Sequence, residues 1–87
     1  MCRNITTLRG LEPPATSEEV EAAARQYVRK VSGVTRPTPA TEAAFEQAVA
    51  TVAWATAEVL QGLPPRRQPP KADPPLRRPE VRARMHR

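Results

Sequence analysis

The stretch from Pro13 to Gly33 carries signals for both ends of one helix, and it constrains the chain more than any other feature. Pro13 and Pro14 favour an extended chain upstream, because the residue before a proline is disfavoured in the helical region. Thr16 is the predicted N-cap, and Glu19 three residues later completes a capping box. Gly33 can adopt the left-handed conformation that ends a helix. We therefore predict a helix between Thr16 and Gly33.

Apolar residues recur at helical spacing within this stretch and predict one buried face. They are Val20, Ala23, Ala24, Tyr27, Val28 and Val31. Charges near both ends complement the helix dipole. These charged residues are Glu18, Glu19 and Glu21 near the start, and Arg29 and Lys30 near the end.

A second helix is predicted from Thr38 or Thr41 to about Leu60. The connection before it, residues 34–40, contains two prolines through which a helix cannot continue. Thr38 precedes a proline at the first helical position, whereas Thr41 precedes a glutamate, and we favour Thr41 as the start. Gly62, followed by two prolines, ends the helix.

The second predicted helix has one apolar stripe and one tryptophan outside it. The stripe consists of Phe45, Ala48, Val49, Val52, Thr56, Val59 and Leu60. Trp54 lies instead on a face shared with Gln47, Thr51, Glu58 and Gln61. An exposed tryptophan on a helix flank marks a contact surface. The alternative, which we favour, is that Trp54 folds over the edge of a groove beside the N-terminal arm.

The N-terminal arm, residues 1–12, carries apolar residues at a spacing of three: Ile5, Leu8 and Leu11. Gly10 disfavours a long helix here. We expect the three apolar side chains to pack onto the two helices.

The net charge of +5 resides in the C-terminal segment. Residues 64–87 hold eight basic and two acidic side chains, whereas residues 1–63 hold six and seven. Seven of the eleven prolines also lie in residues 64–87. Such a segment buries too little apolar surface to offset its ordering entropy, so we predict a disordered tail of polyproline character.

These patterns predict an all-α fold, a helical hairpin of two main helices packed against the N-terminal arm. We expect one small helical domain over residues 1–63 and the tail over residues 64–87. A core this small stabilises a domain by only about 3–5 kcal/mol. A homodimer with four helices is therefore the alternative to a hairpin closed by its own arm.

The sequence resembles the family of small bacterial proteins called domain of unknown function 2277. The matching words are Met1-Cys2-Arg3-Asn4-Ile5, Glu12-Pro13-Pro14-Ala15-Thr16, Gln26-Tyr27-Val28-Arg29-Lys30-Val31-Ser32-Gly33 and Ala43-Ala44-Phe45. The resemblance covers roughly residues 1–63, with the tail outside it. It implies a small, mostly helical bacterial protein and brings no activity. This chain differs from the family pattern at residues 8–11, where the family is more aromatic, and at Trp54, where the family has a small residue.

Cys2 is the one candidate for catalysis. Removal of Met1 would place a free amine beside its thiol, as in N-terminal nucleophile enzymes, and Arg3 would favour the thiolate. The competing interpretation, which we favour, is a small buried cysteine that holds the arm in place. No metal site is predicted, because Cys2 and His86 stand at opposite ends and no zinc-ligand spacing exists.

Two groups of basic residues are candidate binding sites. One, a possible site for a phosphate or carboxylate, consists of Arg3, Asn4, Arg25, Arg29, Lys30 and Arg36. A salt-bridged helix surface, with Glu21 and Arg25 as an i,i+4 pair, is the interpretation we favour for it. The other, a possible nucleic-acid contact, consists of Arg66, Arg67, Lys71, Arg77, Arg78, Arg82 and Arg84. The tail could instead be a ligand of proline-recognising domains or a purely solubilising segment.

We expect a cytoplasmic protein without a membrane anchor, since the N-terminus lacks a signal peptide and no apolar run is long enough to span a bilayer. The predicted function is non-catalytic, either protein interaction or self-association, without a cofactor. The alternatives are low-specificity nucleic-acid binding through the tail and a thiol-dependent activity at Cys2.

Overall fold

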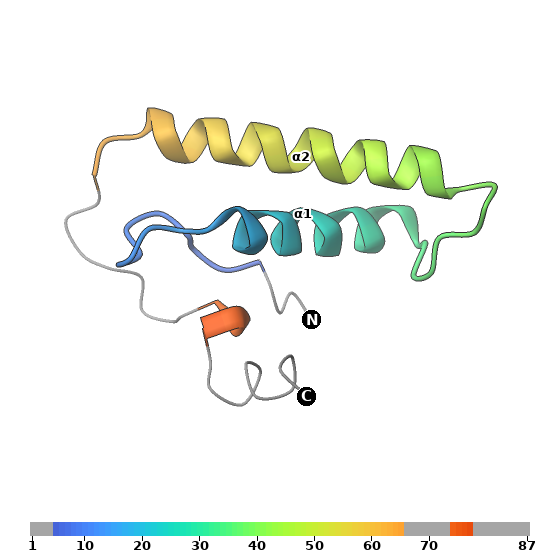
Figure 1. Ribbon diagram of the computed structural model, residues 1–87, viewed down its shortest axis with the longest axis horizontal. Coiled ribbons are helices and arrows are strands. Elements are labelled where there is room, and N and C mark those ends of the chain that lie inside the picture. Colours follow the sequence, from blue (N-terminus) through green and yellow to red (C-terminus); the bar gives the residue numbers. More distant parts are fainter. Residues whose placement is uncertain (1–4, 66–73, 78–87) are drawn as a thin grey trace.

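The computed structural model describes residues 5–65 and 74–77 of the chain. Two antiparallel helices, α1 (Ser17–Ser32) and α2 (Glu42–Gly62), form a hairpin, and a 3-10 turn, η1 (Pro75–Arg77), lies beside the start of α1 (Figure 1). Within these described ranges there is no strand. The predicted all-α helical hairpin is confirmed.

Both predicted ends of α1 are confirmed. The Thr16 hydroxyl accepts a hydrogen bond from the Glu19 amide at 3.1 Å, and the Thr16 amide donates to the Glu19 carboxylate at 2.9 Å. At the other end, Gly33 has a φ of 74° and its amide donates to the Arg29 carbonyl at 2.9 Å. Reciprocal capping and a left-handed glycine therefore fix the length of α1 from within its own sequence.

Both threonines that the sequence offers as the start of α2, Thr38 and Thr41, contribute to the turn before it. The helix begins after Thr41, as we favoured, but the Thr41 hydroxyl does not cap it. That hydroxyl accepts from the Thr38 amide at 2.8 Å, while the Thr38 carbonyl accepts from the amides of Thr41 and Glu42 at 2.9 and 2.8 Å. Thr38 and Thr41 thus form one turn that leads into α2.

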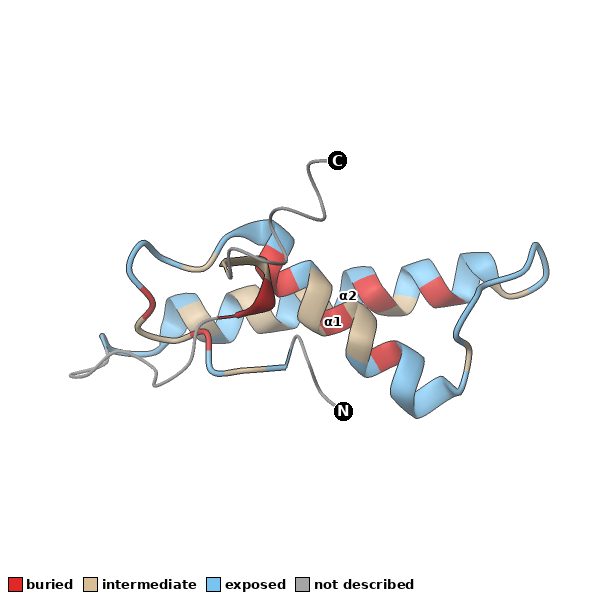
Figure 2. Cartoon of the chain, turned by 90° about the horizontal axis from the view of Figure 1, so that it is seen from below, coloured by how far each residue is buried: buried red, intermediate tan, exposed pale blue. Residues whose placement is uncertain are grey.

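The core has two parts along the hairpin. Towards the connection between the helices, Ala24 and Val28 of α1 pack against Phe45 and Val49 of α2. At the opposite end, Leu8 and Leu11 of the arm pack against Val20, with Ala53 and Leu60 of α2 alongside. Figure 2 shows buried positions, in red, on both helices along the hairpin. The arm therefore completes the core, as expected for Leu8 and Leu11.

The buried face of α1 is narrower than its sequence stripe. Val20, Ala24 and Val28 are buried, whereas Tyr27 and Val31 are 48% and 66% exposed. Residues spaced by four follow a nearly straight line along a helix, and Tyr27 is turned by about 100° from Val28. With only one helix and the arm to pack against, that flank of α1 stays outside the core.

Two other predicted core positions are also exposed. Ile5 of the arm and Val59 of α2 each remain accessible to solvent. Their expected burial is wrong. Val59 lies off the face of α2 on which Phe45 and Val49 are buried. No helix in the described part of the chain is long and apolar enough to cross a membrane.

Candidate functional site

The N-terminal arm folds back to form one wall of a groove. It turns at Gly10, whose φ of 89° is accessible mainly to glycine. This turn directs Leu8 and Leu11 into the core. Between them, the Arg9 guanidinium donates to the Pro64 carbonyl at 3.1 Å through Nε and at 2.7 Å through Nη2. Arg9 therefore ties the arm to the segment that leaves α2.

A groove of about 710 Å³ lies between this arm and the C-terminal half of α2. Its lining is largely apolar and includes Leu8, Leu11, Ala57, Leu60, Leu63 and Pro64. Trp54 lines this groove together with arm residues, in keeping with the interpretation we favoured, but 67% of its surface remains exposed, in keeping with the alternative of a contact surface. Arg9 and Glu12 are the charged side chains among the described residues that line it. This surface suits an apolar ligand better than a charged one.

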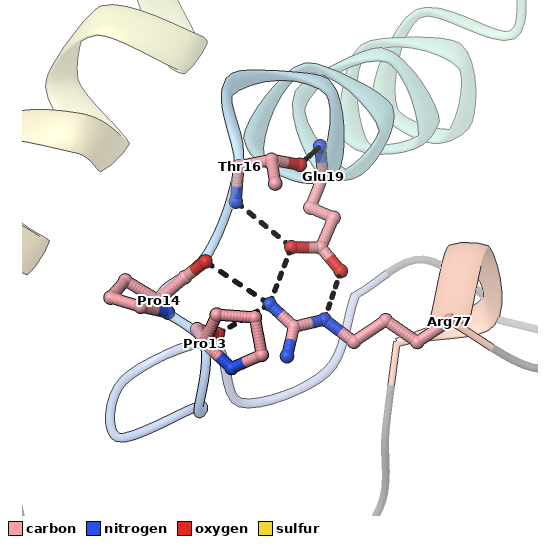
Figure 3. A network of polar contacts seen from close by, with 5 residues as sticks. All are labelled: Pro13, Pro14, Thr16, Glu19 and Arg77. Atoms are coloured by element: carbon pink, nitrogen blue, oxygen red, sulfur yellow. Dashed lines mark hydrogen bonds and ion pairs between the residues drawn. The ribbon is translucent and has the colours of Figure 1, made fainter.

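A second feature adjoins the start of α1, where Glu19 meets Arg77 of η1 (Figure 3). Arg77 Nε donates to Glu19 Oε2 at 2.6 Å, and Arg77 Nη2 donates to Glu19 Oε1 at 3.0 Å. The side chains of Glu19 and Arg77 are only 3% and 15% exposed. The contact is therefore a bidentate ion pair largely shielded from water, which is stronger than a surface pair.

The Arg77 guanidinium also contacts the backbone upstream of the helix. Nη2 donates to the Pro13 carbonyl at 2.7 Å and to the Pro14 carbonyl at 3.1 Å. Neither carbonyl belongs to a helix, so Arg77 supplies donors to backbone acceptors outside the hydrogen-bond ladder of α1. One side chain thus joins the segment before α1, the cap of α1 and η1.

This arrangement lowers the pKa of the Glu19 carboxyl below its usual value. The largest cause is the hydrogen bond from Arg77, which favours the charged carboxylate. Burial opposes the shift, because it removes the charge from water, and the backbone and hydroxyl of Thr16 support it. Glu19 therefore stays ionised at neutral pH although it is buried.

The chain matches the family model DUF2277, described as an uncharacterized conserved protein, over residues 1–84. The chain belongs to the DUF2277 family. The resemblance seen in the sequence is confirmed, but its expected limit at residue 63 was too short, because the match includes Arg77. Searches of curated proteins and of solved structures found no match.

In this DUF2277 protein, one member of the predicted basic cluster, Arg25, is paired with acidic side chains. Arg25 donates to both oxygens of Glu46 at 2.7 and 2.9 Å and to Glu21 at 3.1 Å, which confirms the expected i,i+4 pair. These carboxylates raise the pKa of Arg25, with Glu46 the larger cause. The Arg25 guanidinium carbon also lies 5.8 Å from the centre of the Phe45 ring. Arg25 therefore belongs to the salt-bridged surface that we favoured.

Of the remaining predicted site residues, Arg29, Lys30, Arg36 and Arg77 lie in the described part of the chain. Arg29, Lys30 and Arg36 are exposed, and anion binding by this cluster stays a prediction. The following lie outside the described residues: Cys2, Arg3, Asn4, Arg66, Arg67, Lys71, Arg78, Arg82, Arg84 and His86. Thiol chemistry and nucleic-acid binding by the tail therefore stay predictions as well. In the described ranges no three metal-ligating side chains lie close enough to hold an ion.

Sequence reasoning did not find the role of Arg77 in the DUF2277 fold. Glu19 was fully explained by its cap and by the helix dipole, so nothing in the pattern called for a second partner. Arg77 was counted among the tail cations, because eight basic residues share that segment. Glu19 and Arg77 are 58 residues apart, so their contact has no local sequence signature. Pro74 and Pro75, which come shortly before Arg77, do restrict the backbone, and this favours a fixed turn.

Proposed function

We propose that this DUF2277 protein is a non-catalytic protein-interaction module that binds an apolar segment of a partner protein in the groove beside Trp54. The observation that supports this most directly is the 67% exposure of Trp54 at the border of a largely apolar groove. Tryptophan is among the residues most enriched in the energetic centres of protein interfaces. An exposed tryptophan beside a concave apolar surface is the arrangement that such a centre requires.

The composition of the groove supports a peptide partner. Leu60, Leu63 and the prolines that follow α2 supply apolar contact area, while Gln61 and Ser17 supply polar groups at its edges. A partner segment that carries a few large apolar side chains would bury this surface and leave its backbone near those groups. Arg9 and Glu12 together contribute no net charge, so the groove does not select a strongly charged partner.

Self-association is the alternative to this proposal, and in it a second copy of the chain would occupy the groove. We place the protein in the bacterial cytoplasm as part of this proposal. The family resemblance supports a bacterial source, and a chain with one cysteine suits a reducing compartment.

Selection from a displayed peptide library against the full chain tests the proposal. We expect enriched peptides with several large apolar residues, and we expect them to bind the Trp54→Ala variant about tenfold more weakly, the loss typical of an interface centre. Val59→Ala is the matched control, because Val59 is an exposed apolar residue of α2 that does not line the groove. Its affinity for the same peptides should equal that of the unchanged chain.

Two results would contradict the proposal as stated. The first is the failure to enrich any peptide whose affinity depends on Trp54. The second is a dimer, detected by light scattering, that dissociates on Trp54→Ala substitution, since this would make a second copy the occupant of the groove.

A further inference from the structure

We propose that the N-terminal end of α1 is a binding site for the arginine side chain of a peptide segment, and that residues 74–77 occupy it as a tethered ligand that another arginine-bearing segment can replace. This site is built around Glu19 and adjoins the groove without including Trp54. The proposal does not depend on the function proposed for the groove.

The acceptors of this site are organised by the hairpin itself. The Thr16 amide donates to Glu19 Oε1 at 2.9 Å, which fixes the carboxylate through the capping box and leaves both oxygens turned towards Arg77 (Figure 3). Pro13 and Pro14 fix the backbone that presents two further carbonyl acceptors. Residues 13–19 therefore supply these acceptors, outside the segment that fills the site.

The geometry selects arginine over lysine. Arg77 Nε donates to one Glu19 carboxylate oxygen, and Arg77 Nη2, which carries two N–H groups, lies within hydrogen-bond distance of the other carboxylate oxygen and of the Pro13 and Pro14 carbonyls. The planar fork places Nε–H and Nη2–H side by side opposite the two carboxylate oxygens, and the second Nη2–H is shared by the two carbonyls. An ammonium group also has three donors, but they radiate tetrahedrally from one nitrogen and do not match two carboxylate oxygens side by side. The buried Glu19 carboxylate supplies the negative charge that complements the positive guanidinium.

The segment that fills the site is short and internally organised, as a peptide ligand is. Arg77 follows Pro74, Pro75 and Leu76, and the Arg77 amide donates to the Pro74 carbonyl at 3.0 Å, which closes η1. Two prolines limit the conformations that such a segment loses on binding. Its attachment to the hairpin raises its local concentration to the millimolar range, so a weak affinity is enough to fill the site.

The test uses the full chain with Arg77→Ala, which leaves the site intact and removes its ligand. The probe is the blocked peptide acetyl-Pro-Pro-Leu-Arg-amide, with the sequence of residues 74–77. By calorimetry we expect the peptide to bind the variant about tenfold more tightly than the unchanged chain, in which Arg77 competes for the site. A peptide ending in lysine should bind at least about tenfold more weakly.

A second variant changes the acceptor of the ion pair, Glu19, instead of Arg77. Glu19→Gln retains the capping box, because glutamine serves at this position, but removes the charge that pairs with arginine. Combined with Arg77→Ala, it should abolish peptide binding while the helix content stays the same. Adding Trp54→Ala to Arg77→Ala should leave peptide affinity unchanged, which separates this site from the groove.

A folded Arg77→Ala chain that does not bind the peptide would overturn the proposal and make Arg77 a permanent structural element. If Arg77→Ala does not fold, the peptide should restore its circular dichroism signal in a saturable manner. Failure of the arginine peptide to do so, or equal restoration by the lysine peptide, would also overturn it.

Discussion

Glu19 and Arg77 are 58 residues apart in the sequence, and their side chains meet at 2.6 Å. The same carboxylate caps α1 through Thr16, so one buried acidic group stabilises a local turn and a long-range contact together. Removing Arg77 would leave this carboxylate without its cation, and truncating Glu19 would affect both contacts. The two roles can be separated by substitution.

The ionised Glu19 makes the stability of the fold depend on acidity. Its pKa is lowered in the folded state relative to 4.5, so its contribution is fully present above that value and is lost as the pH falls through the folded-state pKa. We expect the free energy of unfolding, measured with urea, to decrease from about pH 5 downwards. Glu19→Gln should show a smaller decrease over the same range. Equal pH dependence in both proteins would contradict this assignment.

Loss of the Thr16 cap should weaken α1. We expect Thr16→Ala to lower the free energy of unfolding by about 1 kcal/mol, because the Glu19 amide loses its acceptor at 3.1 Å. Thermal melts followed by circular dichroism would measure this change. Thr35→Ala, in the exposed connection after α1, is the control and should melt with the unchanged chain. Indistinguishable melts for the two variants would show that the cap contributes nothing.

Phe45 is the largest side chain in the part of the core near the connection. Phe45→Ala should cost about 3–5 kcal/mol, since it removes a buried ring from contact with Ala24 and Val28, and a loss of this size would leave the variant largely unfolded even without urea. Val59→Ala, at an exposed position of the same helix, should change stability by less than about 0.5 kcal/mol. Urea denaturation of both variants would check the contrast, and similar losses would show that α2 buries a different face.

Two of the ion pairs, Arg25 with Glu46 and Arg77 with Glu19, should differ in strength. Arg25 and Glu46 form a bidentate pair, but the Glu46 side chain is 48% exposed, so solvent and salt screen the interaction. Double-mutant cycles should give a smaller coupling energy for Arg25 with Glu46 than for Arg77 with Glu19. Added salt should reduce the first coupling more than the second. The reverse order would mean that burial does not decide the strength of these pairs.

Local features of this fold could be predicted from the sequence, because each depends on residues a few positions apart. The Thr16–Glu19 box, the left-handed Gly33 and the Glu21–Arg25 pair are of this kind. The start of α2 was less certain, since Thr38 and Thr41 carry competing signals and the structure uses both in one turn.

The other features of the fold depend on which elements pack against each helix face, and the spacing of apolar residues does not give that information. Tyr27, Val31 and Val59 fit helical stripes, yet a hairpin of two helices cannot cover them. Arg77 was assigned to a disordered, basic segment, and only the fold shows its contact with Glu19. The boundary expected after residue 63 stays a prediction, although this contact links segments on both of its sides.

The capping box has a further consequence for the order in which the protein is made. Thr16 and Glu19 leave the ribosome together, so the first turn of α1 can form while the codon for Arg77 is still untranslated. During that interval the Glu19 carboxylate has its local amide partner but depends on water for the rest of its solvation. Once Arg77 has also emerged, its guanidinium replaces that water, so the local part of the cap precedes the long-range part during synthesis.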